Sequence, residues 1–222
     1  MLFEDDAPLF ADRQEAGQQL AERLEQLHLA DDVLVLALPR GGVPVGYEVA
    51  CALRVPLDVF VTRKIGAPEN PEFAIGAVAS DGTLILDERV VEQLGIPDDY
   101  VLSETEHQLM EIERRMGAYR GDRPPLQVEG RTVILVDDGI ATGSTVRASL
   151  QALRKGNPGR LILAVPVGPP QTIEELRSLA DEVVVLATPE PFWAVGRFYQ
   201  SFEQTTDEQV VELLEAASQR ET

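Results

Sequence analysis

The sequence predicts an α/β protein in which helices flank a doubly wound parallel sheet of about five strands. Five nearly continuous apolar runs alternate along the chain with segments of helical periodicity. Such runs are typical of parallel strands, because the connecting helices cover both faces of a parallel sheet. The runs are residues 33–38, 57–61, 133–136, 161–165 and 183–186.

Length and composition allow a single domain with a substantial core, and the charge narrows the range of partners. The chain has 222 residues, 44% of them hydrophobic, and its formal net charge is −19. A surface this acidic repels phosphodiester backbones, so nucleic acid is not an expected partner. The chain starts with the acidic segment 1–6, contains no membrane-length apolar run, and has one cysteine, Cys51. We therefore expect a cytoplasmic protein without a membrane partner.

The first helix and strand lead to a glycine-rich turn. Residues 12–27 carry apolar side chains on one helical face, with Asp12 as the N-cap. The strand at 33–38 ends in Pro39-Arg40-Gly41-Gly42, and Pro44 suits the first turn of a following helix. Two glycines beside a cation make a backbone-lined anion site, although an ordinary strand-to-helix turn explains these residues equally well.

The second strand leads into two cations, Arg63 and Lys64. Residues 65–72 are rich in glycine and proline and lack a core pattern, which predicts a long functional loop. The apolar runs 74–79 and 83–86 flank a Ser-Asp-Gly turn and predict a hairpin. A solvated strand end is the alternative interpretation of the two cations. Helical periodicity predicts further helices at 88–94, 98–119, 146–155, 171–179 and 207–217.

The third strand carries the most specific pattern, residues 133–145 (VILVDDGIATGST). Asp137 and Asp138 stand where the strand emerges, and a turn of small residues then leads into a helix. A helix N-terminus offers unpaired backbone N–H groups and a partial positive charge, and small residues let a phosphate approach them. Two carboxylates beside an anion site indicate a ligand that also carries hydroxyls or a metal ion. A ribose phosphate with bound magnesium satisfies both requirements.

Competing interpretations of residues 133–145 have less support in the sequence. An acidic strand end followed by a glycine turn also occurs in α/β proteins without a ligand there. A Walker loop is excluded because no lysine follows Gly143, and a receiver-type acidic pair would follow the first strand of a shorter chain. A sugar-phosphate phosphatase would need a D-x-D motif at the strand end, which the sequence lacks.

The pattern resembles the phosphoribosyl pyrophosphate (PRPP) signature of type I phosphoribosyltransferases. The resemblance implies that Asp137 and Asp138 hold the ribose hydroxyls or their Mg²⁺. It implies a phosphate loop that wraps the 5-phosphate, formed by Ala141, Thr142, Gly143, Ser144 and Thr145. The implied function is Mg²⁺-dependent transfer of the 5-phosphoribosyl group from PRPP to a nitrogenous base, with release of pyrophosphate. The alternative is a PRPP-sensing regulatory protein without turnover, and either is compatible with a homodimer.

The resemblance extends to the two earlier strand ends. Arg40, Gly41 and Gly42 match the pyrophosphate loop of this family, in which a cis peptide bond at a non-proline residue would here join Pro39 to Arg40. Arg63 and Lys64 resemble the Arg-Lys pair that precedes the flexible catalytic loop of orotate and adenine phosphoribosyltransferases. Residues 63–86 would then be a lid that keeps water from the ribosyl centre.

The last segment, about 188–204, resembles the hood that covers the base in purine-specific members. Its aromatic-x-Val-Gly sequence places Trp193 in the stacking position, with Phe192 as a substitute and Val195 beside them. The alternative is a packing cluster, which we prefer for the three rings Phe198, Tyr199 and Phe202. The sequence departs from hypoxanthine-guanine enzymes because Ala141 and Gln200 replace two of their aspartates. We expect one domain over 1–222, with its core at about 30–187.

Overall fold

The structure is a computed structural model that describes residues 8–29, 31–121, 123 and 127–220. The acidic segment 1–6 therefore lies outside the described residues. The helices are α1 Arg13–Glu25, α2 Gly42–Leu53, α3 Glu88–Leu94, α4 Asp98–Arg120, α5 Ser144–Lys155, α6 Pro170–Leu176 and α7 Asp207–Ser218. The strands are β1 Val33–Ala37, β2 Leu57–Val59, β3 Thr62–Ala67, β4 Asn70–Ala79, β5 Leu84–Leu86, β6 Thr132–Val136, β7 Arg160–Val167 and β8 Glu182–Ala187.

The core is a five-stranded parallel sheet in the order β2-β1-β6-β7-β8, which confirms the predicted fold class. All five residues of β1 and all five of β6 are buried, as the apolar runs 33–38 and 133–136 predict. β1 pairs with β6 in register, so that Ala37 lies opposite Val136. The chain segments that follow these two strands therefore leave the sheet side by side, which is where ligands bind in folds of this kind.

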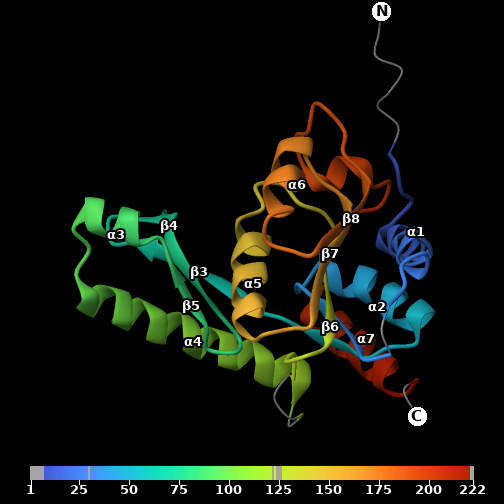
Figure 1. Cartoon of the computed structure of the whole chain (residues 1–222), viewed down its shortest axis with the longest axis horizontal. Helices are drawn as coiled ribbons and strands as arrows, with labels where there is room; N and C mark the ends of the chain where they lie inside the picture. Colours follow the sequence, from blue (N-terminus) through green and yellow to red (C-terminus); the bar gives the residue numbers. More distant parts are fainter. Residues whose placement is uncertain (1–7, 30, 122, 124–126, 221–222) are drawn as a thin grey trace, which may run out of the picture.

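Helices cover both faces of the sheet (Figure 1), and alternate residues of its strands pack against them. Val33, Val35 and Ala37 of β1 belong to a core that also contains buried residues of α1, α2 and α7. Leu34, Leu36 and Leu38 point the other way, into a core shared with α5 and α6. Asp12 caps α1 as predicted, because its Oδ1 accepts the backbone N–H of Glu15 at 2.9 Å.

The segment between β2 and β6 forms an arm beside the core, built from α3, α4 and the antiparallel sheet β3-β4-β5 (Figure 1). The predicted hairpin is present, because β4 and β5 pair antiparallel. The predicted long loop at 65–72 is wrong, since β3 pairs with β4 across this range and leaves only a tight turn at the tip. Ile65 and Ile75 are fully buried in a small core that α4 completes, so β3 and β4 belong to a packed hairpin.

Residues 188–206, which connect β8 to α7, contain little regular structure apart from a short 3₁₀ helix, Val195–Phe198. The aromatic rings of this region pack with the segment before α1, where Leu9 and Phe10 donate backbone hydrogen bonds to Phe198 O at 2.9 and 3.0 Å. Within the described ranges, no helix is both long and apolar enough to cross a membrane.

Candidate active site

The glycine turn after β1 packs directly against the two aspartates after β6. A Cβ atom on Gly41 would lie 2.1 Å from Oδ2 of Asp138, and one on Gly42 would lie 2.9 Å from Cα of Asp137. Only glycine allows this approach, because real Cβ atoms do not come so close to other heavy atoms. The Pro39–Arg40 peptide bond is cis, as the resemblance implied. The two predicted loops therefore form one site.

The acidic pair is unusual in its electrostatics. Asp137 accepts the backbone N–H of Asp138 through Oδ1 at 2.9 Å. Burial, and next to it the charge of Asp138, raises the pKa of Asp137 well above its usual range. Burial also raises the pKa of Asp138, although Arg13 opposes that shift. Two carboxyl groups in this state suit a ligand that brings hydroxyl donors or positive charge to them.

Two residues outside the predicted site hold Asp138. Arg13 of α1 donates to Asp138 Oδ2 from Nε at 2.8 Å and also places Nη2 2.8 Å from that oxygen. Tyr199 donates from its hydroxyl to the backbone oxygen of Asp138 at 2.5 Å. Burial raises the pKa of Tyr199, and the charge of Asp138 adds to that shift, so the phenol stays protonated and able to donate. Sequence reasoning missed Arg13, which lies 125 positions from its partner.

The predicted phosphate loop opens α5. Gly143 precedes the helix with φ +74°, a left-handed conformation that favours glycine, and a Cβ there would lie 2.6 Å from Cγ2 of Thr172. No side-chain hydrogen bond caps the start of α5. Ala141, Thr142, Ser144 and Thr145 are exposed. The first N–H groups of α5 are thus available to an anion.

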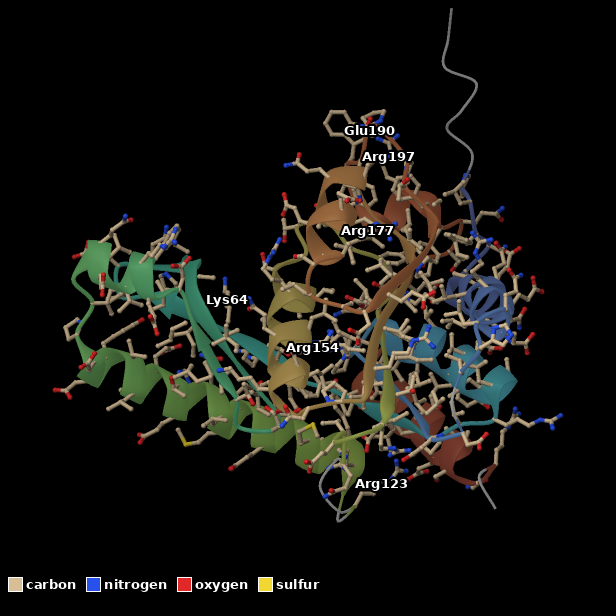
Figure 2. All side chains as sticks on the ribbon, viewed as in Figure 1. Lys64, Arg123, Arg154, Arg177, Glu190 and Arg197 are labelled. Carbon is tan, nitrogen blue, oxygen red and sulfur yellow. The ribbon has the colours of Figure 1, made fainter. Side chains whose placement is uncertain are left out.

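A cleft of about 1420 Å³ separates this loop from the arm. Thr142, Ser144 and Thr145 line one side, and Arg63 and Lys64 of β3 line the other. Figure 2 shows Lys64 on the side of the arm that faces α5. The structure therefore brings the two predicted lid cations and the phosphate loop to a common cleft, although they reside on a strand and not beside a loop.

α4 positions the first of these cations through a buried glutamine. Nε of Arg63 donates to Oε1 of Gln108 at 2.9 Å, and Nε2 of Gln108 donates to Oε1 of Glu104 at 2.7 Å. Gln108 is 8% exposed, which is low for a glutamine on a helix otherwise rich in charge. The sequence does not predict this role, because Gln108 lies among the many charged residues of α4.

The remaining predicted residues lie at the margins of this arrangement. Arg40 extends toward α7, where its Nη1 is 3.7 Å from Oδ1 of Asp207, and the Tyr119 hydroxyl donates to that same oxygen at 2.6 Å. Val195 covers the turn after the acidic pair, since its Cγ1 would lie 2.6 Å from a Cβ on Gly139.

Some aromatic residues of the predicted hood are exposed, and others pack against neighbouring rings. Trp193 is 72% exposed, whereas Phe192 is half-buried with its ring centroid 5.0 Å from that of Phe198. Tyr199 is buried against Phe10, with ring centroids 5.3 Å apart, and its ring lies 5.0 Å from that of Phe202. The packing interpretation of these last rings is therefore confirmed, although Phe202 stays 36% exposed, and Trp193 is the most exposed of the five hood rings.

The fold agrees with the comparisons to known proteins. The sequence profile of the phosphoribosyl transferase domain matches residues 10–200, so the chain belongs to the phosphoribosyl transferase family. A provisionally named phosphoribosyl transferase of Mycobacterium tuberculosis (strain H37Rv) is 46% identical over 209 residues. The match covers 94% of this chain and 47% of that protein, so the chain spans about half the length of this curated relative.

Two further matches extend the comparison. The crystal structure of TT1426 from Thermus thermophilus superposes with a TM-score of 0.82 at 45% identity, covering 92% of this chain and 97% of that one. The bifunctional protein PyrR of Ralstonia nicotianae is 30% identical over 138 residues, covering 56% of this chain and 77% of that protein. The family in general binds PRPP and a base.

The residues at the strand ends fit a magnesium ion only in part. Carboxylate oxygens are ligands that Mg²⁺ prefers, and burial, which raises the pKa of both Asp137 and Asp138, favours a ligand that brings positive charge to them. Among the described residues, no group of three or more His, Cys, Asp or Glu side chains could hold a metal. An ion here would thus take most of its ligands from a bound substrate and from water, as Mg²⁺ usually does.

Proposed function

We propose that this protein transfers the 5-phosphoribosyl group of PRPP to a nitrogenous base and releases pyrophosphate. One observation carries the proposal: the glycine turn after β1 and the acidic pair after β6 form a single site, directly before the open N-terminus of α5. A ligand placed there meets backbone donors for phosphate on two sides and carboxylate acceptors for hydroxyls between them. Family membership supports the same activity.

On this proposal, a different set of residues binds each part of PRPP. The N–H groups at the start of α5 and the hydroxyls of Thr142, Ser144 and Thr145 hold the 5-phosphate. Asp137 and Asp138 accept hydrogen bonds from the ribose hydroxyls. Arg40, Gly41 and Gly42 bind the pyrophosphate. Catalysis is then mainly positioning and electrostatic stabilisation, which together can supply most of a rate enhancement.

Magnesium would be held at Asp137 and Asp138, partly through PRPP, and would neutralise charge on the departing pyrophosphate. The acceptor is a small nitrogenous base, because the net charge of −19 disfavours nucleic acid. Its site is the hood, where Trp193 offers an exposed ring and Val195 adjoins the strand end. Ala141 offers no carboxylate to the base, so hypoxanthine and guanine are weaker candidates than bases that need no proton acceptor.

A PRPP-sensing regulatory protein of the same fold is the second candidate. The similarity of this chain to the bifunctional protein PyrR supports this second candidate. Both candidates bind PRPP, and only the transferase consumes it. Release of pyrophosphate therefore separates them.

The test of the proposed function is ligand-dependent stability combined with turnover. We expect millimolar PRPP with Mg²⁺ to raise the melting temperature, because a ligand that binds only the folded state stabilises it by mass action. Pyrophosphate should then be released in the presence of one base from a panel of purines and pyrimidines. A thermal shift without release by any base would favour the sensor, and no shift at all would refute both.

Lys64 provides a test of the cleft. Lys64→Ala should lower kcat on the order of tenfold while KM for PRPP changes less, because a cation facing the phosphate loop matters most when charge develops on the leaving group. The control is Lys155→Ala, which removes the other lysine of the chain at the far end of α5, where Nζ donates to Leu84 O. If Lys64→Ala changed KM alone, Lys64 would serve only ground-state binding.

A further inference from the structure

The guanidinium of Arg13 joins three segments that are far apart in the sequence. Its Nε and Nη2 both lie 2.8 Å from Oδ2 of Asp138. Its Nη1 donates to the backbone oxygen of Glu203 at 2.7 Å, and its plane lies over the Phe202 ring with Cζ 3.8 Å from the centroid. The arginine thus connects α1, the end of β6 and the end of the hood.

This contact is enclosed by its surroundings. The Arg13 side chain is 12% exposed and that of Asp138 is 14% exposed, so water screens the pair weakly. The Tyr199 hydroxyl fixes the backbone of the same aspartate at 2.5 Å. Phe10, three residues before Arg13, packs against the Tyr199 ring. Asp138 is therefore held at its carboxylate and at its backbone by two segments that meet beside it.

The geometry determines how Asp138 is oriented. Both donors of Arg13 converge on Oδ2, the oxygen that also faces the tight turn at Gly41. A planar guanidinium that donates twice to one oxygen and stacks on a ring has little freedom to rotate. Fixing Oδ2 in this way also fixes the direction of Oδ1, the other oxygen of that carboxylate.

We propose that Arg13 is a positioning residue for phosphoribosyl transfer, which orients Asp138 toward the ribose and couples it to the hood. The inference rests on the proposed function, because it needs Asp138 to accept hydrogen bonds from ribose. A purely structural arginine would hold α1 and the hood together without affecting which part of the ligand binds. The two roles therefore differ in what they predict for ligands that do and do not contain ribose.

The experiment compares two ligands on three variants. Arg13→Met keeps an apolar stem over Phe202 and removes every donor, whereas Arg13→Lys keeps the charge and loses the planar fork. Arg23→Ala is the matched control, since it removes a cation from an exposed position of the same helix. Affinities for PRPP with Mg²⁺ and for inorganic phosphate are measured by calorimetry well below the melting temperature, with kcat where a base supports turnover.

We expect Arg13→Met to weaken PRPP binding on the order of 10- to 100-fold, the usual scale for hydrogen bonds to a charged group, and to leave phosphate binding at the α5 N-terminus unchanged. Arg13→Lys should recover part of the loss, and Arg23→Ala should match wild type. Unchanged PRPP affinity in Arg13→Met would overturn the inference. Equal losses for PRPP and phosphate would also overturn it, in favour of a structural role. Wild-type protein that binds phosphate but not PRPP would instead refute the proposed function, and the inference with it.

Discussion

Replacing Asp137 and Asp138 together by asparagine should lower turnover on the order of 10²- to 10⁴-fold while the protein stays folded. Each carboxylate would lose a charge-assisted hydrogen bond to ribose, and such bonds contribute about 1.5–3 kcal/mol each, where about 1.4 kcal/mol corresponds to tenfold. Asparagine has nearly the same shape, so the packing of Gly41 and Gly42 against the pair should persist. The measurement is kcat/KM for PRPP with the base that supports turnover.

The stability of the double variant gives an independent check. Burial raises the pKa of both aspartates, which means that the folded protein disfavours their charged forms. Removing these charges should therefore favour the folded, ligand-free protein, and the loss of the ion pair between Asp138 and Arg13 opposes that gain. The shift in melting temperature that PRPP causes should be abolished. The matched control replaces Asp98 and Asp99, an exposed adjacent pair in the first turn of α4. Wild-type turnover in the Asp137/Asp138 variant would show that these carboxylates do not bind ribose.

The strands of the core could be predicted from the sequence because each is marked by a pattern within its own few residues. Apolar runs without interruption mark strands buried on both faces, and all five runs became strands of the parallel sheet. Because the sheet is parallel, the glycine turn and the acidic pair both follow the carboxyl ends of strands and lie at the same edge. The contact itself, with Gly41 almost touching Asp138, follows from the register of β1 and β6, which no single segment encodes.

The strands of the arm were predicted less well because their alternation of apolar and polar residues is weak. Small residues at Gly66, Ala67 and Ala74 hide the alternation of β3 and β4, and Ile65 and Ile75 become core only once α4 covers them. Such burial depends on a helix that follows more than 20 residues later in the chain. Composition alone therefore suggested a loop where tertiary packing makes a hairpin.

Arg13 and Gln108 show the same limit at the site. Each lies on a helix that carries many charged residues, and each contacts a partner from a distant segment. Arg13 reaches Asp138 only because the N-terminal segment pairs with the hood, through Phe10 and Tyr199. Sequence motifs identify residues that contact a ligand, because several of these residues are neighbours in the chain. The residues that orient those groups are fixed by the folded chain and leave no local pattern.

Gly41→Ala should lower kcat/KM for PRPP on the order of 10²-fold, although alanine suits the local backbone. Gly41 has φ −61° and ψ −34°, a helical conformation that costs alanine nothing. The added methyl group would lie 2.1 Å from Oδ2 and 2.7 Å from Cγ of Asp138, whose carboxylate Arg13 also holds. The carboxylate must then move, and displacements of about 1 Å at a reacting centre can cost about 10²-fold.

The same substitution should destabilise the fold by about 1–3 kcal/mol, as overpacking usually does. Gly117→Ala is the control, because nothing lies within 4 Å of the added methyl group and the exchange within α4 should stabilise by about 0.5–1 kcal/mol. A double-mutant cycle identifies the cause. In the Asp138→Ala background the obstructing carboxylate is absent, so the stability cost of Gly41→Ala should disappear. If the cost were the same in both backgrounds, the close approach of Gly41 to Asp138 would not be what requires glycine at this position.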